Sequence, residues 1–509
     1  MKTGTLRVLL AAVIAIAAID TARAQCITNF CRPPPFSPPG GPASPGNPGP
    51  HHNGTVYIVS AVVFAVVGWA IGRRLFSDDG PGPSPSSSPF PGLPPGPSTA
   101  GLPPPGGGGA GGGGGAGGGG GSGGGGSGGG GTSVAPLRSG FNLPPAGETR
   151  FLEDEVLADS AAPNAGELAA RHGITCFETV RVRLTGHTLH RCRRDGDQTV
   201  SEMIRALNVE RQIIGAQPHY RFFTVQSTGS DGTAEQYAPE KLGALEAHRL
   251  ATGSRVTVAV IDSGVDPTHP DLAGAIAGSY DTTDAERPHS HGTGMAGAIA
   301  ARGTVQGIAP GANLLTVRAF SASSGSAEGT TLTIIKGLDW AAEKGARVVN
   351  MSFAGPADPR LRDALAKANA RGLVLIAAAG NAGPTSPPLY PAADPSVIAV
   401  TATDASDGLF SGANRGKYIA VAAPGVDILV PAPDGGYQLT TGTSVAAAEV
   451  SGVVALLIER NPRLTPKDVR RILMRTAKHL GPRGSEREYG AGLVNALQAV
   501  TAAAKQPGM

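Results

Sequence analysis

Short apolar runs recur through the second half of the chain, and patterns typical of helices lie between them. Strands are expected at 256–262, 313–319, 347–351, 373–379, 397–402 and 418–423, and helices at 331–344, 359–371, 444–459, 465–478 and 492–504. Strands that alternate with helices form parallel sheets, because each parallel connection must cross over the sheet. The sequence therefore predicts an α/β domain over residues 236–505, with a mainly parallel sheet covered on both faces in three layers.

Two polar residues stand at the ends of predicted elements in this domain. The apolar run at 256–262 ends in Asp262, which Ser and Gly follow, so a carboxylate lies at the carboxyl edge of a buried strand. Open α/β sheets place their chemistry at that edge. His291 precedes a helix of small residues. A lone Asp is usually a turn residue and a lone His is usually structural, so neither residue decides a function by itself.

A third polar residue stands before the helix predicted at 444–459. The residues Thr-Thr-Gly-Thr-Ser end at Ser444, and the strong helix formers Ala446–Ala448 follow. Ser444 would lie at a helix N-terminus, where unpaired N–H groups and the helix dipole favour negative charge. A nucleophile and a developing oxyanion are well placed there. The alternative is that Ser444 only caps the helix, as serine often does; the order Asp, His, Ser favours the nucleophile.

Together these stretches resemble the motifs of subtilisin-like serine peptidases, the subtilase family (peptidase S8). Asp262 matches the aspartate of the Val-Ala-Val-Ile-Asp-Ser-Gly motif, His291 the histidine of His-Gly-Thr, and Ser444 the nucleophile of Gly-Thr-Ser. Asn381, which ends Ala-Ala-Ala-Gly-Asn, matches the oxyanion-hole asparagine. The resemblance covers residues 236–505. It implies a serine endopeptidase with an Asp262, His291 and Ser444 triad, and an oxyanion hole formed by Asn381 and the backbone N–H of Ser444.

The chain departs from the family after the nucleophile. The usual Met-Ala-Ala-Pro-His-Val-Ala-Gly is replaced by Val-Ala-Ala-Ala-Glu-Val-Ser-Gly over residues 445–452. Alanine at position 448 propagates a helix well, and the helix dipole is expected to tolerate the acid Glu449 in the early helix. No catalytic position is altered, so an active enzyme is expected. His289 and His269 are expected to be structural.

The resemblance also implies where substrate would bind. Asn350–Ala354 resembles the segment that lines the substrate, and Gly325–Gly329 would pair with an extended polypeptide substrate as a sheet edge. Ordinary loop sequence is the alternative for both segments. The candidate substrate-binding residues are Ser352, Phe353, Ala354, Gly329 and Gly380. No metal ligand and no cofactor is predicted; a structural calcium ion is compatible with the resemblance, but no acidic loop is assigned to it.

Residues 149–235 are predicted to form a small domain and its junction to the peptidase. Strands are expected at 151–157, 177–184, 187–192 and within 209–225, and helices at 168–172 and 203–207, behind capping boxes at 164–167 and 199–202. The order β-α-β-β-α-β predicts a ferredoxin-like α+β domain. In subtilases this position typically holds an inhibitory propeptide, so the resemblance implies a zymogen inhibited by its own propeptide. The alternative is an accessory domain that is never cleaved.

The first 148 residues have no pattern of a globular core. Residues 1–24 have the basic, apolar and small-residue regions of a signal peptide, and residues 25–54 are Pro-rich. Residues 55–72 carry no charge and Arg73-Arg74 follow, which predicts one transmembrane helix; a buried core helix is the alternative. Residues 73–148 are rich in Pro, Gly and Ser, and are expected to be a disordered linker because they bury too little apolar surface to offset their ordering entropy.

Two rules disagree about the side of the membrane on which the peptidase lies. A cleaved signal peptide followed by a span at 55–72, with Arg73-Arg74 behind it, places the peptidase in the cytoplasm. However, Cys176 and Cys192 lie on two predicted strands joined near residue 185, so they would face each other across a hairpin. A disulfide there needs an oxidising compartment. We expect a single-pass membrane protein with an extracytoplasmic catalytic domain.

Composition limits the remaining functions. The formal net charge is +3, and no basic stripe with interleaved aromatic residues occurs, so no nucleic-acid partner is expected. The leading hypothesis is a membrane-tethered serine endopeptidase made as a zymogen. Its rival is a catalytically idle binding module with a peptidase fold at the cell envelope, which the four matched site residues disfavour. A structural envelope protein with a Gly-rich spacer would explain only the first 148 residues.

Overall fold

The computed structural model describes residues 136–161, 164–224, 227–228, 236–283, 287–322 and 327–505. All of them belong to the second of two compact units, Ser88–Met509. The predicted signal peptide, Pro-rich segment and transmembrane helix, and most of the predicted linker, lie outside the described residues. Among the helices that are described, none is both long enough and apolar enough to cross a membrane.

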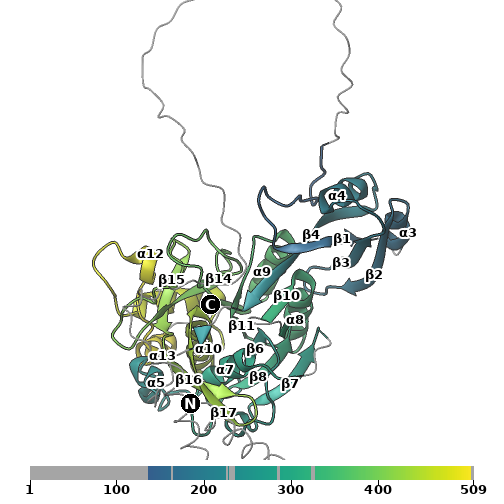
Figure 1. Ribbon diagram of the computed structural model, residues 1–509. Helices are drawn as coiled ribbons and strands as arrows, with labels where there is room; N and C mark the ends of the chain where they lie inside the picture. Colours follow the sequence, from purple (N-terminus) through teal and green to yellow (C-terminus); the bar gives the residue numbers. More distant parts are fainter. Residues whose placement is uncertain are drawn as a thin grey trace, which may run out of the picture. The chain divides into compact units, whose positions relative to one another are not determined.

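A sheet of seven parallel strands forms the centre of the catalytic domain, as the alternating pattern predicts (Figure 1). The strand order is β15-β14-β13-β11-β6-β8-β7. The bounds are β6 Thr257–Asp262, β7 Ile276–Asp281, β8 Asn313–Arg318, β11 Val348–Met351, β13 Val374–Ala378, β14 Val397–Thr403 and β15 Ile419–Pro424. Each of the six predicted strands is present within two residues of its expected ends, and the edge strand β7 was not predicted.

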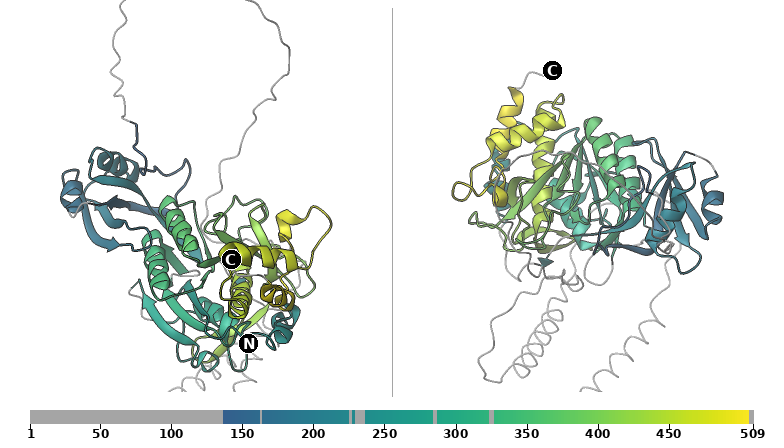
Figure 2. Two further views of the ribbon diagram at one scale, coloured as in Figure 1. Left: turned by 180° about the vertical axis from the view of Figure 1, so that it is seen from behind. Right: turned by 90° about the horizontal axis from the view of Figure 1, so that it is seen from above.

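Helices cover both faces of this sheet (Figure 2). One face packs against α7 Ser290–Ala300, α10 Thr443–Arg460, α11 Pro466–Thr476 and α13 Ala496–Ala504, and the other against α8 Thr331–Glu343 and α9 Pro359–Ala370. Strand β6 serves both cores: Val258 and Val260 face one, while Ala259 and Ile261 face the other. Burial on both faces explains why these strands are nearly continuous apolar runs. The expected three-layer α/β fold is confirmed.

Some elements were not predicted. A hairpin of β16 Ile428–Ala432 and β17 Gly436–Thr441 pairs with the short β5 Ser227–Thr228. Asp434 and Gly435 in its turn have φ of 61° and 71°, the left-handed conformation that the two central residues of a type I′ turn adopt. Short helices lie at α5 Ala238–Lys241, α6 Ala244–Ala247, α12 Glu486–Tyr489 and the 3₁₀ turn Pro270–Leu272. Helix α13 begins later than expected because the side chain of Asn495 caps it by accepting from the N–H of Gln498.

The small domain has the predicted β-α-β-β-α-β order. Its elements are β1 Phe151–Ser160, α3 Ala165–Ala170, β2 Ile174–Arg181, β3 Thr188–Arg194, α4 Val200–Asn208 and β4 Ile213–Thr224. The antiparallel order β2-β3-β1-β4 is that of a ferredoxin-like domain. The capping box at Thr199 and Glu202 is confirmed, but the one at Asn164 is wrong, because the Asn164 side chain makes no cap hydrogen bond.

The small domain begins earlier than the predicted linker boundary at residue 148. Phe141 is buried in its core with Ala216, and the two residues form an isolated β-bridge. Arg138 donates hydrogen bonds to Asn208 and to the carbonyl oxygens of Glu210 and Ile213. A Pro-rich composition concealed this extension, because its few apolar residues are too widely spaced to show a period.

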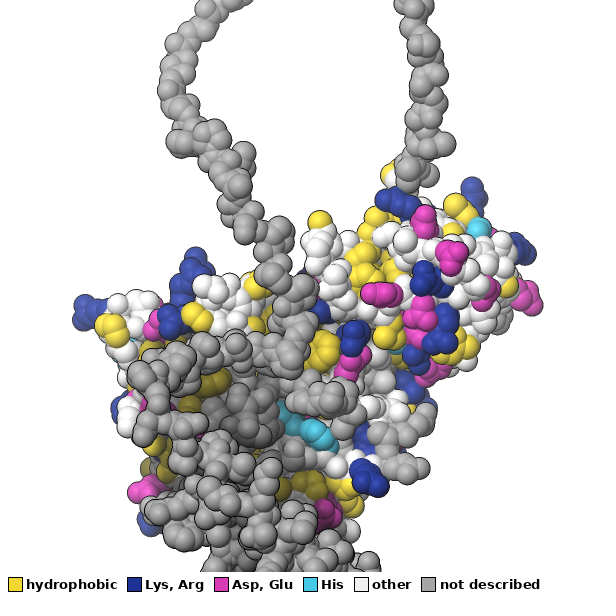
Figure 3. All heavy atoms as spheres, in the orientation of Figure 1, with side chains coloured by type: hydrophobic (Ala, Val, Ile, Leu, Met, Phe, Trp, Pro, Cys, Tyr) yellow, Lys and Arg dark blue, Asp and Glu magenta, His cyan; other side chains and the backbone are white. Residues whose placement is uncertain are grey.

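Charged side chains of both signs are interspersed over the small domain (Figure 3). The buried Glu155 accepts hydrogen bonds from Arg191, Arg193 and His219. Burial alone would raise the pKa of Glu155, but these hydrogen bonds hold its pKa at about 2. The carboxylate therefore stays ionised at neutral pH and ties β1 to β3 and β4.

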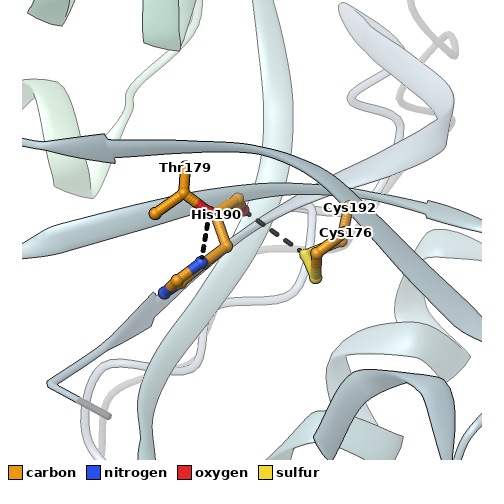
Figure 4. The surroundings of a disulfide bond; sticks show 4 residues. All are labelled: Cys176, Thr179, His190 and Cys192. Carbon is orange, nitrogen blue, oxygen red and sulfur yellow. Dashed lines mark hydrogen bonds between the residues drawn. A yellow bond between two sulfur atoms is a disulfide. The ribbon is translucent and has the colours of Figure 1, made fainter. Parts of the chain in front are cut away.

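A disulfide joins Cys176 in β2 to Cys192 in β3, which are directly opposite in the antiparallel register (Figure 4). Cys192 is fully buried in the small-domain core. On the same pair of strands, Nδ1 of His190 is 3.0 Å from the hydroxyl of Thr179. The covalent link fixes the register of this hairpin, in which a slip by one residue would turn each side chain to the other face.

Candidate active site

The predicted acid and base meet at the carboxyl end of the central sheet. Asp262 ends β6, and His291 lies in the first turn of α7. Nδ1 of His291 is 2.6 Å from Oδ1 of Asp262, and both side chains are buried. The N–H and hydroxyl of Ser263 donate to the same carboxylate oxygen at 2.7 and 3.1 Å. Ser263 therefore orients Asp262. The sequence shows that a Ser follows the Asp, but this role of Ser263 was not predicted.

This contact determines which nitrogen of His291 can act as a base. A carboxylate only accepts hydrogen bonds, so Nδ1 carries the proton in the neutral imidazole and Nε2 is the acceptor. Nε2 is buried and has no hydrogen-bond partner among the described residues. The two nearby histidines that were expected to be structural contact the backbone: the ring of His289 accepts from the N–H of His291, and Nε2 of His269 is 2.9 Å from the carbonyl oxygen of Gly436.

Ser444 lies where the sequence predicts, at the start of a long helix. It is the second residue of α10, behind the N-cap Gly442, and only 1% of its surface is exposed. Its hydroxyl donates to the carbonyl oxygen of Ser352 at 3.2 Å. Helix α7, which carries His291, packs against α10. The N–H of Ser444 belongs to the first turn, which has no helical acceptor for its donors.

Asn381 follows β13, and its side chain is held by the residue before Ser444. Its Oδ1 accepts from the N–H and hydroxyl of Thr443 at 3.0 and 2.7 Å. These two bonds fix the orientation of the amide, so its NH₂ group faces away from Thr443. Gly380 lies behind this contact: its N–H donates to the Thr443 hydroxyl, and a Cβ on it would lie 2.8 Å from Nδ2 of Asn414. Thr443 was not predicted, although it directly precedes Ser444.

A buried polar network supports the backbone of Ser444. The Ser451 hydroxyl lies 3.1 Å from Oδ1 of Asn350 and 2.8 Å from the carbonyl oxygen of Ala447, so these two acceptors share its proton. Nδ2 of Asn350 donates to the hydroxyl of Ser352 at 2.9 Å. That hydroxyl donates to the carbonyl oxygen of Ser444 at 2.9 Å. Ser451 is one of the departures from the family motif, and it lies two helical turns after Ser444, so both face the same side of α10. The departure supplies a hydrogen bond that alanine could not make.

Glu449 behaves differently from the expectation. The side chain is 2% exposed, and its Oε2 has no hydrogen-bond partner among the described residues. Burial raises the pKa of Glu449 well above its usual value of 4.5. The helix dipole therefore does not stabilise a charge here, because the cost of removing the carboxylate from water is larger.

We expect Glu449→Gln to make the stability of the protein less dependent on pH. The folded protein binds this proton more tightly than the unfolded chain, so stability falls as pH rises from 4.5 towards the raised pKa. Within that window the loss is about 1.4 kcal/mol per pH unit. Glutamine has no such proton. The Tm of Glu449→Gln minus the Tm of the parent should therefore become more positive as the pH is raised from 5 to 8.

Thermal unfolding in a Ser444→Ala background, which prevents autolysis, would measure this effect. Glu343→Gln is the matched control, because Glu343 is exposed at the end of α8. A Tm difference between Glu449→Gln and its parent that stays constant with pH would contradict a protonated buried acid.

Three of the predicted substrate-binding residues flank a strand of the small domain. Strand β4 pairs antiparallel with β10 Ala327–Thr330 on one side and with β12 Phe353–Ala354 on the other. Phe222 lies opposite Gly329, and Phe223 opposite Ala354. Ser352, next to β12, contacts Ser444. The structure brings these residues together, whereas Gly380 contacts Thr443 and Asn414 instead.

Phe222 of β4, the strand between β10 and β12, packs in a cluster of aromatic rings. Its fully buried ring meets Phe353 edge-on, with centroids 6.0 Å apart, and Phe353 lies against Phe320 at 4.8 Å. A Cβ on Gly355 would lie 2.3 Å from the Phe222 ring. A glycine at position 355 therefore makes room for a large flat side chain in the groove.

The family resemblance allows a structural calcium ion. The described residues contain no group of three or more His, Cys, Asp or Glu side chains able to hold a metal ion. The buried Asp271 accepts from the N–H groups of Thr304 and Val305 at 3.0 and 2.8 Å and from the hydroxyl of Tyr437 at 3.1 Å. Protein donors therefore occupy this carboxylate.

Comparison with known proteins agrees with this geometry. The profile of the subtilase family matches residues 253–492. The chain is 36% identical to thermitase of Thermoactinomyces vulgaris over 277 residues, which cover 53% of this chain and 96% of thermitase. This chain belongs to the subtilase family of serine endopeptidases. It is also 42% identical to subtilisin E of Bacillus subtilis (strain 168) over 48% of this chain and 65% of that protein.

A solved structure shares the fold. Fervidolysin from Fervidobacterium pennivorans, described as a keratinolytic enzyme related to subtilisin, superposes with a TM-score of 0.62 and 25% identity. The match covers 74% of this chain and 65% of fervidolysin. The shared region is longer than the 253–492 matched by the family profile.

Proposed function

We propose that this subtilase is a membrane-tethered endopeptidase, made as a zymogen, that hydrolyses peptide bonds through Asp262, His291 and Ser444. The observation that carries the proposal is the 2.6 Å contact between Asp262 and His291 at the end of β6. A serine hydroxyl is a poor nucleophile at neutral pH, so a base must take its proton during attack. Nε2 of His291 takes that proton, while Asp262 holds Nδ1–H and stabilises the imidazolium.

The oxyanion of the tetrahedral intermediate needs donors that are already in position. The NH₂ group of Asn381 and the backbone N–H of Ser444 serve as these donors. Two hydrogen bonds from Thr443 to Oδ1 support this role, because they hold the Asn381 amide in one orientation before substrate arrives. Donors fixed in this way need not reorganise when charge develops.

The zymogen proposal is supported by the position of β4. This strand of the small domain pairs with β10 and β12, the two strands that would otherwise pair with an extended substrate. Further contacts tie the small domain to α8 and α9. The carboxylate of Asp339 accepts from the N–H of Leu184 at 2.7 Å, and that of Asp358 from the Gln217 amide at 2.8 Å. The small domain inhibits by occupying the substrate groove.

We expect the wild-type chain to cut itself between the two domains, within about residues 224–245, where the sequence is polar and contains Gly. Mass spectrometry of the wild type should show a shortened catalytic fragment, and Ser444→Ala should remain full length. Trace wild-type enzyme added to Ser444→Ala serves as a control that the junction can be cut. Identical full-length chains in both preparations would refute self-processing.

We also propose that residues 55–72 anchor the protein and that the catalytic domain lies outside the cytoplasm. The disulfide between Cys176 and Cys192 supports the second point, because such bonds persist in oxidising compartments. Alkaline phosphatase fused after Met509, in a Ser444→Ala background, is expected to be active. An inactive fusion, with both cysteines alkylated as free thiols in cells, would place the peptidase in the cytoplasm.

A further inference from the structure

An acidic side chain projects from one wall of the groove. Glu328 lies in β10, directly opposite Phe223 of β4, while Arg221 lies opposite Thr330. Arg221 and Glu328 are therefore diagonal neighbours on the same face of the sheet, within reach of long side chains. Nε of Arg221 donates to one carboxylate oxygen of Glu328 at 2.5 Å, and Nη2 donates to the other. The contact is bidentate, the geometry that arginine provides and lysine does not.

The side chains on the two faces of β4 have different surroundings in the catalytic domain. Phe222 packs against Phe353 and is fully buried, whereas Arg221 and Phe223 lie on the partly exposed face. The Arg221 guanidinium lies 5.5 Å from the centroid of the Phe223 ring. Side chains alternate between the two faces of a strand. In the observed register of β4, Arg221 therefore meets Glu328, and the next residue, Phe222, meets the aromatic rings on the other face.

Glu328 depends on β4 for its charge partner. Within the described part of the chain, Arg221 is the sole ion-pair partner of Glu328. The Glu328 side chain is 25% exposed even with Arg221 in place. Hydrogen bonding to Glu328 raises the pKa of Arg221, so the guanidinium is fully charged in this contact. When β4 leaves, an unpaired carboxylate remains on the wall of an otherwise neutral groove segment, Ala327–Thr330.

We propose that Glu328 is a specificity-determining residue of the peptidase. It selects polypeptides with a basic residue, preferably Arg, directly before an aromatic residue, at the places that Arg221 and Phe222 occupy. The inference rests on the proposed function, since β4 shows how a substrate binds only if substrates also pair with β10 and β12. The competing explanation is that the ion pair only ties the small domain to the catalytic domain.

Three internally quenched peptides separate these explanations. One has the sequence of residues 220–228; the others carry Gln or Glu in place of the residue at 221. Self-processed wild type, Glu328→Gln and the control Glu343→Gln are compared by kcat/KM, with active sites counted by a fluorophosphonate probe. The control removes an acid of α8 that pairs with Arg183 and lies outside the groove strands.

The wild type should hydrolyse the Arg peptide about threefold faster than the Gln peptide, since partly exposed ion pairs are modest in strength. It should prefer Arg over Glu by about tenfold, because the Glu peptide adds repulsion between like charges. Glu328→Gln should reduce both ratios towards one, as should 1 M salt, which screens exposed charges. Glu343→Gln should keep the wild-type ratios.

Equal kcat/KM values of the wild type for the Arg and Glu peptides would overturn the inference and leave the peptidase assignment intact. Unchanged ratios in Glu328→Gln would also overturn it, and would leave the ion pair as an interdomain tie. If no peptide is hydrolysed and no probe is bound by the wild type, the proposed function fails, and this inference with it.

Discussion

Ser444→Ala should abolish both labelling by a fluorophosphonate probe and hydrolysis of peptides. Alanine at the start of α10 keeps the helix but has no oxygen to attack the carbonyl carbon or the probe. In subtilisin, a relative of this chain, loss of the corresponding nucleophile lowers kcat by about 10⁶-fold, and we expect that scale here. Probe labelling followed by peptide mapping should place the adduct on Ser444 in the wild type.

Ser406→Ala is the matched control, since Ser406 lies in an exposed turn and should keep full labelling and hydrolysis. Circular dichroism should show that Ser444→Ala is folded like the wild type. Normal hydrolysis by Ser444→Ala would remove Ser444 from the mechanism. A folded wild type that stays full length and that the probe never labels would instead favour an idle binding module.

Asn381→Ala should lower kcat far more than it raises KM. The amide donates to negative charge that exists only in the transition state, so the substrate complex loses little when the donor is removed. Removal of the corresponding amide in subtilisin costs about 10²–10³ in kcat, which is about 2.7–4 kcal/mol. The same scale is expected here, because Thr443 holds the Asn381 amide rigidly.

Steady-state kinetics on one quenched peptide would measure both parameters. Thr443→Ala is an informative companion: it removes one donor to Oδ1 but keeps the backbone N–H contact, so its loss of kcat should be smaller than that of Asn381→Ala. A kcat for Asn381→Ala equal to that of the wild type would place the oxyanion donors elsewhere.

The central sheet and the positions of Asp262, His291 and Ser444 could be predicted because each depends on a local pattern. A strand buried on both faces is an apolar run, and a polar residue at its end is visible in the sequence. The hairpin of β16 and β17 was missed, since Pro431 and Pro433 interrupt any alternation and β17 is largely polar. Strand β16 does bury Ile428 and Val430 in the core, but two apolar positions are too few to reveal a period in the sequence.

The contacts that support the site could not be predicted, because they join distant parts of the chain. Thr443 meets Asn381 across 62 positions, and Ser451 meets Asn350 across 101. Glu449 was misjudged for a related reason: its place in the helix is visible in the sequence, but its burial depends on what packs against α10. Local electrostatics favours a charge there, and tertiary packing removes the water that the charge needs.

Strand β4 pairs with β10 on one side and with β12 on the other, and this arrangement fixes the distance between β10 and β12. Neighbouring strands lie about 4.8 Å apart, so β10 and β12 face each other across about 10 Å with room for one extended backbone. Unpaired strand edges usually attract the sheets of other proteins and promote aggregation. Here the two edges face each other with room for only one strand between them. The edge of a folded sheet cannot enter, because further strands lie behind it. Only an isolated, extended segment can satisfy both edges, which confines their pairing to unfolded or looped polypeptide.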